Sequence, residues 1–377
     1  MKGSVVKKGK KYYVVIDMGR DALGKRKQKW ISGFSSEKEA EKELPRILIQ
    51  YEDGELLNSN KITLEKLCEN WLEYKNKYEN LADTTRAGYE NIINKHIIPL
   101  IGKLKTQEIT TFHLQNYIDV KYNEGLKVTT LKNHRRVLRS LFIYSIDMEI
   151  INKNPMTKVK LPKGEKNKTA ALELDDAKRL LEIVQKNLTL KMPVTLALLL
   201  GLRRGECLAL TWDKIDFDNK IITIDSNLEY VDKKLIFKDV KTDKSNRKIA
   251  ISDGVIAILK AHKNWQNEMR LRSGGTWRND YNLVCTKKTT GKPLVPHSMS
   301  SNFKVFLKNN GFPHVRFHDL RHTNASIMLA AEIAPKIASN RLGHSSVGIT
   351  LDLYSHVLEN VDREVSDKIE ELLIKKI

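Results

Sequence analysis

The sequence predicts a multidomain α+β protein, because three stretches of its 377 residues differ in periodicity. A β-branched and aromatic stretch near the N-terminus predicts a small three-stranded sheet followed by one helix. A central stretch with apolar residues at helical spacing predicts a helical domain. The remaining half mixes helical periods with four short strand-like runs, which predicts a mainly helical domain with a small antiparallel sheet. We place these domains at residues 1–55, 63–157 and 169–377, with a basic linker at 158–168.

The N-terminal stretch combines strand-like sequence with positive charge. Residues 12–16 and 28–32 read as strands on either side of a turn signal at 19–24. Ser36 and Glu39 form a capping-box pattern that predicts a helix running to about Tyr51. Ten basic and two acidic residues give the first thirty residues a charge of +8. This imbalance favours a β-ribbon that binds DNA over a basic surface that is merely solvated.

The central domain is predicted to contain four helices, at about 63–78, 84–98, 110–123 and 128–148. The last one carries a basic cluster around Arg135 and Arg139, so one face of the domain could bind DNA. A helical bundle with solvated charges explains the pattern equally well. The linker contains five lysines and one glutamate, which is typical of an extended tether that crosses a phosphate backbone.

The overall charge and the apolar runs narrow the class of partner. The chain carries 66 lysines and arginines against 46 acidic residues, a net charge of +20, so a polyanionic partner is expected. The longest apolar run, 194–202, is too short to span a membrane, and two arginines follow it. No apolar signal-peptide region is seen near Met1. We therefore expect nucleic acid, and not a membrane, as the partner.

The cysteines indicate a reducing compartment and no cysteine-based metal site. The three cysteines are far apart in sequence and form no CxxC pair: Cys68, Cys207 and Cys285. Each is better explained as a small apolar core residue. We expect a cytoplasmic, bacterial protein associated with the nucleoid.

Four short motifs stand out in the last domain. GLRRGE at 201–206 places Arg203 at the end of the most apolar helix, where Glu206 can hold its guanidinium. KTDKSNR at 241–247 is a polar turn between two strands. HDLRH at 318–322 and LGHSS at 342–346 follow, and a tyrosine stands at 354. Taken singly, each has an ordinary explanation, such as a helix-terminal cation, a hairpin tip or a packed aromatic residue.

A zinc site is not expected at the HDLRH motif. His318 and His322 are spaced as metal ligands on a helix, but Asp319 stands where the metalloprotease pattern needs a glutamate. The positive charge of Arg321 also opposes a dication there.

The motifs together resemble the tyrosine recombinase/integrase family. Its active-site pattern matches six residues in order: Arg203, Lys241, His318, Arg321, His344 and Tyr354. The helical region is similar to the core-type DNA-binding domain of that family. The N-terminal sheet is similar to the arm-binding domain of conjugative-transposon and lambda-type integrases.

The resemblance implies a site-specific recombinase that cleaves and rejoins DNA through a 3′-phosphotyrosine. Tyr354 is then the nucleophile and Lys241 the general acid for the departing 5′-oxygen. The two arginines would bind the scissile phosphate, and the two histidines would assist them by hydrogen bonding or proton transfer. No cofactor, metal or ATP is expected. Arg204 is not expected to be catalytic, because the family's arginine aligns with the first of the pair.

Two other functions remain open at this stage. One is strand cleavage and rejoining of the type IB topoisomerase kind, and the other is a non-enzymatic DNA-binding regulator. The separate basic sheet favours an integrase of a transposon or prophage, because two DNA-binding modules let one chain bridge core and arm attachment sites. The partners implied are double-stranded DNA, a homotetramer, and accessory bending and excision proteins. An apolar stripe at Val365, Ile369, Leu372 and Leu373 predicts a C-terminal helical tail that contacts either its own domain or a neighbouring subunit.

Overall fold

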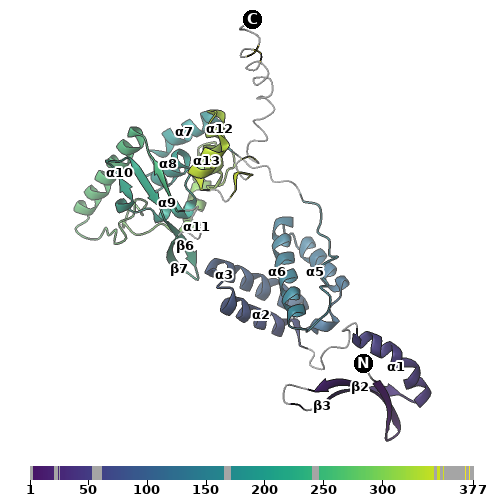
Figure 1. Cartoon of the computed structure of the whole chain (residues 1–377). Coiled ribbons are helices and arrows are strands. Elements are labelled where there is room, and N and C mark those ends of the chain that lie inside the picture. The colour runs from purple at the N-terminus through teal and green to yellow at the C-terminus, as the bar shows by residue number, and fades with distance from the viewer. Residues whose placement is uncertain are drawn as a thin grey trace. The chain divides into compact units, whose positions relative to one another are not determined.

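The computed structural model describes residues 3–20, 24, 26–52, 62–164, 171–239, 246–343, 346–348, 351, 370 and 373. The chain divides into two compact units, 1–166 and 167–377, shown in Figure 1. Among the described residues, no helix is both long and apolar enough to cross a membrane. Most of the predicted C-terminal tail lies outside the described residues, including Val365, Ile369 and Leu372.

The first unit begins with a three-stranded antiparallel sheet covered by one helix. Its elements are β1 (Gly3–Lys8), β2 (Lys11–Arg20), β3 (Arg26–Phe34) and α1 (Glu37–Glu52), with β2 in the middle of the sheet. Because side chains alternate along a strand, Val14 and Ile16 share the face that packs on Ala40 of α1. Tyr13 and Trp30 pair with their ring centroids 5.9 Å apart. The predicted sheet and helix are therefore confirmed.

The start of α1 differs slightly from the predicted capping box. The Glu39 N–H donates to Ser36 Oγ at 3.2 Å, as expected. The Glu39 carboxylate, however, accepts from the backbone N–H and the hydroxyl of Ser35, at 2.9 and 2.7 Å. The reciprocal contact thus reaches one residue further back than the pattern predicts.

A helical bundle follows, built around one apolar core. Its elements are α2 (Leu64–Tyr78), α3 (Asp83–Ile92), the π-helical turn η1 (Ile93–Ile97), α4 (Ile98–Ile101), the short turn η2 (Thr106–Glu108), α5 (Thr111–Asn123) and α6 (Val128–Asp147). Trp71, Leu114 and Phe142 are fully buried in this core. All four predicted helices are present.

The predicted helix over 84–98 contains a wider turn. The Ile98 N–H donates to the Ile93 carbonyl, five residues back, and the chain then continues through Pro99 to Ile101. Pro99 has no N–H to donate, so a regular helical ladder cannot continue through it. The apolar spacing did not reveal this turn, because the turn shifts the helical position of the following apolar residues by only one residue.

A polar contact lies inside the bundle. The Tyr117 hydroxyl of α5 lies 2.9 Å from Nδ1 of His134 in α6, and neither side chain is exposed to solvent. The ring of His96, which η1 carries, has its centroid 4.8 Å from that of His134.

Residues 158–164, the described part of the predicted basic linker, run along the bundle. The Lys160 N–H donates to Gln115 Oε1 at 2.9 Å, and Gln115 Nε2 donates to the Lys160 carbonyl at 3.2 Å. Val159 is buried in the core of the bundle. This part of the linker is anchored on α5, because apolar residues such as Val159 alternate with its lysines.

Within the described residues, the second unit has ten regular elements before helix α11. They are α7 (Leu174–Val184), α8 (Lys191–Leu200), α9 (Arg204–Ala209), the turn η3 (Trp212–Lys214), β4 (Ile215–Asp216), β5 (Ile221–Ile224), β6 (Ser226–Val231), β7 (Lys234–Asp239), β8 (Arg247–Ala250) and α10 (Asp253–Arg272). Helices α11 (Pro296–Asn309), α12 (Asp319–Ala330) and α13 (Pro335–Leu342) follow.

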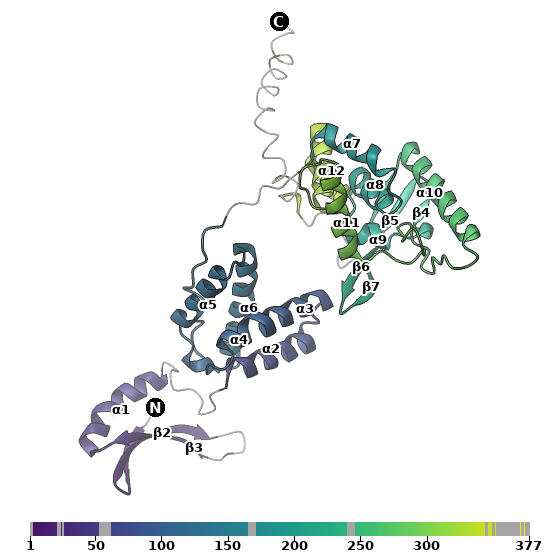
Figure 2. The same cartoon turned by 180° about the vertical axis from the view of Figure 1, so that it is seen from behind.

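The strands form two small antiparallel sheets, ordered β4-β5-β8 and β6-β7. The predicted turn at 241–247 therefore joins strands of different sheets and is not the tip of one hairpin; residues 240–245 lie outside the described ranges. Strand β6 and helix α9 were not predicted, because each has only six residues and β6 begins with the polar pair Ser226-Asn227. Figure 2 shows α10 alongside β4 and β5, where Leu259 joins the same core as Ile222.

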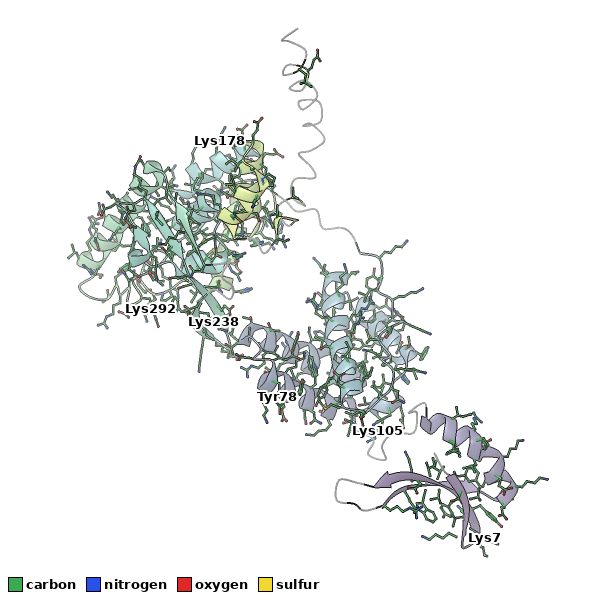
Figure 3. All side chains as sticks on the ribbon, in the orientation of Figure 1. Lys7, Tyr78, Lys105, Lys178, Lys238 and Lys292 are labelled. Atoms are coloured by element: carbon green, nitrogen blue, oxygen red, sulfur yellow. The ribbon has the colours of Figure 1, made fainter. Side chains whose placement is uncertain are left out.

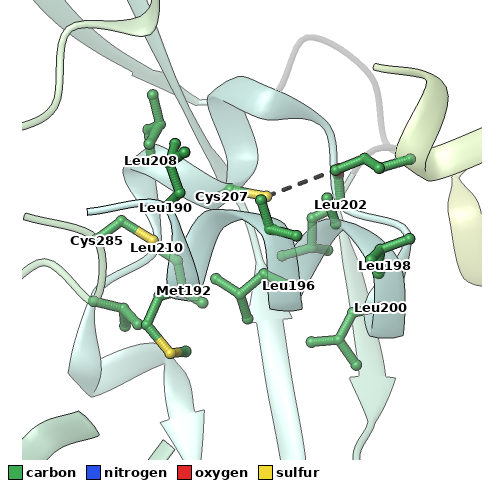
Figure 4. Close-up of a cluster of buried hydrophobic side chains, with 14 of the residues drawn as sticks. Leu190, Met192, Leu196, Leu198, Leu200, Leu202, Cys207, Leu208, Leu210 and Cys285 are labelled. Atoms are coloured by element: carbon green, nitrogen blue, oxygen red, sulfur yellow. Dashed lines mark hydrogen bonds between the residues drawn. The ribbon is translucent and has the colours of Figure 1, made fainter. Parts of the chain in front are cut away.

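Helix α8 lies at the centre of this unit's core. Its side chains from 192 to 198 are all buried, as expected for a helix that is apolar on every side. Figure 4 shows Leu196, Leu198 and Leu200 beside Cys207 of α9. The helix ends at Gly201, where φ is +66° and a Cβ would lie 2.3 Å from Leu342 Cδ2. Helices α8 and α13 thus approach closely at this glycine.

Candidate active site

Three of the six predicted active-site residues lie where α8, α9, α12 and α13 meet. Arg203 is the N-cap residue of α9, His318 directly precedes α12, and Arg321 is in the first turn of α12. The other three lie outside the described residues: Lys241, His344 and Tyr354. Their positions and roles stay predictions.

Arg203 is held by the helix that it begins. Its backbone N–H donates to Glu206 Oε2 at 2.8 Å, and Nη1 donates to Glu206 Oε1 at 2.7 Å. Nη2 donates to the Gly343 carbonyl at 2.7 Å. The predicted contact between Arg203 and Glu206 is confirmed. The Arg203 side chain is 34% exposed, so a ligand can reach its guanidinium from solvent.

The Glu206 carboxylate is buried between two arginines. Arg247, the first residue of β8, donates from Nη1 to Oε1 at 3.1 Å and from Nη2 to Oε2 at 2.9 Å. Burial alone would raise the pKa of Glu206, but hydrogen bonds and charge from Arg247, with a further contribution from Arg203, outweigh it and lower the pKa to about 2. The carboxylate is therefore ionised at neutral pH.

Arg321 is almost completely buried, with 2% of its surface exposed. Its Nη1 donates to the Gly201 carbonyl at 2.8 Å and its Nη2 to the Leu342 carbonyl at 2.5 Å. Burial, together with the positive charge of Arg203, lowers the pKa of its guanidinium to about 9. Arg321 still carries its charge at neutral pH.

Three arginines bind three consecutive carbonyls at the end of α13. Arg247 Nε donates to the Arg341 carbonyl at 2.9 Å, and the next two carbonyls accept from Arg321 and Arg203. The last carbonyls of a helix have no partner within the helix and carry partial negative charge. The guanidiniums satisfy them and fix the backbone that leads directly to residue 344.

The two histidines of the HDLRH motif pack edge to face, with ring centroids 5.0 Å apart. Desolvation, then the positive charges nearby, lowers the pKa of His318. Desolvation also lowers the pKa of His322. Both rings are therefore neutral at pH 7, so each carries one N–H donor and one acceptor nitrogen.

Other charged residues of the motifs have separate contacts. Asp319 is buried and accepts from the backbone N–H and the guanidinium of Arg316. Arg204 donates to Ser300 Oγ at 2.9 Å, away from the Glu206 carboxylate. Within the ranges that the structure covers, no group of three or more His, Cys, Asp or Glu side chains could hold a metal ion.

Three family models match consecutive parts of the chain. The first is described as the N-terminal SAM-like domain of phage integrase and covers residues 63–122. The second is the arm DNA-binding domain, at residues 4–51. The third, the phage integrase family model, covers residues 170–360, which is half of the chain and includes all six predicted site residues. The chain belongs to the phage integrase family. It is thus a tyrosine-type recombinase, a DNA strand-transferring enzyme.

Relatives of this integrase cover between three quarters and nearly all of its length. A protein described as tyrosine recombinase XerC-like, from Caldanaerobacter subterraneus, is 30% identical over 393 residues and covers 99% of both chains. The ICEBs1 integrase of Bacillus subtilis is 28% identical and covers 76% of this chain and 78% of its own.

Solved structures show the same fold. The Tn1549 transposon integrase, in complex with a circular intermediate DNA, has a TM-score of 0.70 at 19% identity and covers 82% of this chain and 99% of its own. A lambda integrase tetramer bound to a Holliday junction has a TM-score of 0.59 at 19% identity and covers 91% and 92%.

The integrase motifs led to Arg203 and Arg321 but not to the third arginine of the cluster. Arg247 ends the KTDKSNR stretch and takes an inward position of β8, next to buried Ile249. The sequence did contain a signal for Arg247, namely an arginine at an inward position of a predicted strand. A buried charge needs a partner, so such a residue is expected to belong to a charged cluster. The strand was predicted, but the orientation of its first residue was not considered.

Proposed function

We propose that this integrase binds the scissile phosphate with Arg203 and Arg321 and attacks it with Tyr354. One observation carries the proposal: the two guanidiniums meet at the end of α13, on the carbonyls of Leu342 and Gly343 directly before His344, and the Arg203 side chain is 34% exposed. Fixed cations in a partly buried site stabilise the negative charge that develops on non-bridging oxygens. Guanidinium forks suit this purpose better than lysine.

The proposed reaction conserves the phosphodiester bond energy. The Tyr354 Oη attacks phosphorus and passes its proton to the acceptor nitrogen of a neutral site histidine, a 3′-phosphotyrosine bond forms, and the bond from phosphorus to the 5′-oxygen breaks. Lys241 gives a proton to that oxygen. His344 and His318 assist at the phosphate. A 5′-hydroxyl then attacks the phosphotyrosine and releases the tyrosine, so no ATP is needed.

We further propose that three regions bind DNA. Residues 1–55 bind arm sites, 63–157 bind core sites and 158–168 follow the backbone between the core-binding region and the catalytic domain at 169–377. The N-terminal sheet supports this, because Trp30 is 46% exposed and the Lys8 ammonium lies 5.6 Å from its ring centre. Lys7 projects from the same sheet in Figure 3. Aromatic and basic side chains on one ribbon suit a nucleic-acid groove.

The proposed active species is a homotetramer on two duplexes, since recombination through this chemistry needs four tyrosines for four strands. The lambda integrase tetramer on a Holliday junction supports the same assembly here. We propose that the chain integrates and excises a mobile element at the bacterial nucleoid, with accessory bending and excision proteins.

A suicide substrate tests the proposal. Wild-type protein should form a covalent adduct on a denaturing gel, and Tyr354→Phe should bind the same DNA without forming one. Tyr281→Phe is the matched control, since Tyr281 is exposed and stacks on Phe237. An adduct that persists in Tyr354→Phe would falsify the assignment. Resolution of a synthetic Holliday junction then distinguishes a recombinase from a type IB topoisomerase.

A further inference from the structure

We infer that Arg247 is a positioning residue for strand cleavage, because it shares the Glu206 carboxylate with Arg203 and so leaves Arg203 with positive charge for the scissile phosphate. This inference rests on the proposed function. It concerns a residue that touches neither the phosphate nor the tyrosine in that scheme.

The geometry shows how the carboxylate is shared. Glu206 Oε1 accepts from Arg203 Nη1 at 2.7 Å and from Arg247 Nη1 at 3.1 Å. Oε2 accepts from the Arg203 backbone N–H and from Arg247 Nη2 at 2.9 Å. Arg247 therefore makes the two-pronged contact, while the guanidinium of Arg203 makes a single contact with one oxygen.

The charges in this contact do not cancel. Two guanidiniums share one carboxylate, and the carboxylate is 2% exposed, so water hardly screens it. If Arg247 lost its charge, the whole carboxylate would act on Arg203. The remaining pair would then be neutral, and the attraction of Arg203 for a phosphate would fall.

Arg247 also connects two chain segments that bear predicted site residues. It lies six residues after Lys241 in the sequence, and its Nε donates to the Arg341 carbonyl, three residues before His344. A loss of activity on substitution could therefore arise from charge or from backbone placement. The experiment must separate these two causes.

The experiment measures single-turnover cleavage of a suicide substrate by full-length protein at saturating DNA. Two substrates are compared: one with a natural scissile phosphate and one in which a methyl group replaces a non-bridging oxygen, which removes the negative charge. The variants are Arg247→Met and the double variant Arg247→Met/Glu206→Gln, whose second change removes the carboxylate charge but retains a side-chain carbonyl acceptor.

We expect Arg247→Met to slow cleavage of the natural substrate by about 10- to 100-fold, as when an outer partner of a charged site is removed. On the uncharged substrate its defect should shrink to less than about threefold, because no charge is left to stabilise. The double variant should cleave the natural substrate at least about tenfold faster than Arg247→Met does. Equal defects on both substrates, or no recovery in the double variant, would overturn the inference and leave Arg247 a purely structural residue. A wild-type rate in Arg247→Met would also overturn it.

Arg247→Met leaves a buried carboxylate with fewer partners and could fail to fold. Circular dichroism and DNA binding report this directly, and the double variant, which has no such carboxylate, then decides. It should fold and cleave within about tenfold of wild type; a folded double variant that does not cleave contradicts the inference. Arg272→Met is the matched control, since Arg272 is 69% exposed and pairs with Glu268 on the surface. If wild-type protein itself forms no Tyr354 adduct, the proposed function fails instead.

Discussion

The two units bury polar centres of opposite kinds. In the second unit, 167–377, which carries the proposed active site and is called the catalytic unit below, Arg321, Arg247 and Glu206 are charged although each is at most 9% exposed. In the helical bundle, the buried contact joins Tyr117 and His134, both uncharged. The arginines have a carboxylate and three backbone carbonyls as partners, whereas His134 Nε2 has no hydrogen-bond partner.

The difference shows what a buried charge requires. Desolvation lowers the pKa of His134 to about 4, and the charges of His96 and Lys121 add to this effect. Lys121 itself pairs with Glu124 at 2.8 Å, so that carboxylate is engaged. In the catalytic unit, the desolvation of Glu206 is outweighed by two guanidiniums. A buried group thus keeps its charge only where neighbouring groups compensate it.

The largest effect is expected from Arg203→Lys, because lysine cannot reproduce the guanidinium fork that holds Glu206 and Gly343 while facing the phosphate. Single-turnover cleavage should fall by about 10²- to 10³-fold, while DNA binding changes little. Arg204→Lys is the control, since Arg204 contacts Ser300 and not Glu206. If the two variants lost cleavage rate equally, Arg203 would have no special role in the chemical step, and both arginines would act in DNA binding.

Acid should destabilise the two units through different groups. His134 has an ordinary pKa of 6.5 and a folded pKa of about 4, so the unfolded chain binds its proton more tightly. The bundle should therefore lose stability as pH falls from 6.5 to 4, by about 3 kcal/mol. The folded pKa of Glu206 falls from 4.5 to about 2. The catalytic unit should lose stability in two steps: between pH 6.5 and about 4 through its buried histidines His262 and His318, whose pKa values desolvation lowers to about 4, and between pH 4.5 and 2 through Glu206.

Amide hydrogen exchange, corrected for intrinsic rates, can follow α5 and α6 separately from α8 and α9 in the full chain. The double variant His134→Leu/Tyr117→Phe removes both polar partners. It should therefore abolish the loss of protection in α5 and α6 between pH 6.5 and 4 and leave the acid response of α8 and α9 unchanged. A loss of protection in α5 and α6 between pH 6.5 and 4 that persists in the double variant would contradict the assignment of His134.

A smaller effect is expected from Gly201→Ala. The left-handed backbone there and the 2.3 Å approach of a Cβ to Leu342 should destabilise the catalytic unit by about 2 kcal/mol or more. Gly274→Ala is a matched control, because Gly274 also has a positive φ but has no atom within 4 Å of a Cβ. The two changes in the free energy of unfolding are measured in urea. Their difference gives the cost of the steric clash between the new Cβ and Leu342. The bundle should be unaffected by either change.

No effect is expected from chelation. In the proposed mechanism the phosphate is met by arginines and a lysine and not by a metal, so cleavage should continue in excess EDTA. Activity that is lost in EDTA and restored by Mg²⁺ or Zn²⁺ would require a metal in the mechanism, and the charged centre would then need a different explanation.

The sequence predicted most of the helices because their apolar spacing is strong, as in α2, α6 and the wholly apolar α8. It predicted Arg203 and Arg321 because their motifs have a recognisable order. The π-helical turn, strand β6 and helix α9 were missed, since each is short or polar and is stabilised by packing that local sequence does not encode. The role of Arg247 at Glu206 was missed for the same reason: the two residues are 41 positions apart.

The arginine contacts at the end of α13 have a consequence for how this region can vary. The three guanidiniums bind main-chain oxygens, which every amino acid supplies. A substitution at Arg341 leaves its carbonyl in place, whereas deletion of one residue from α13 would rotate the carbonyls by about 100° and shift them by about 1.5 Å along the axis. All three contacts would then be lost together. Natural variants of this helix should therefore differ in residue identity but seldom in length.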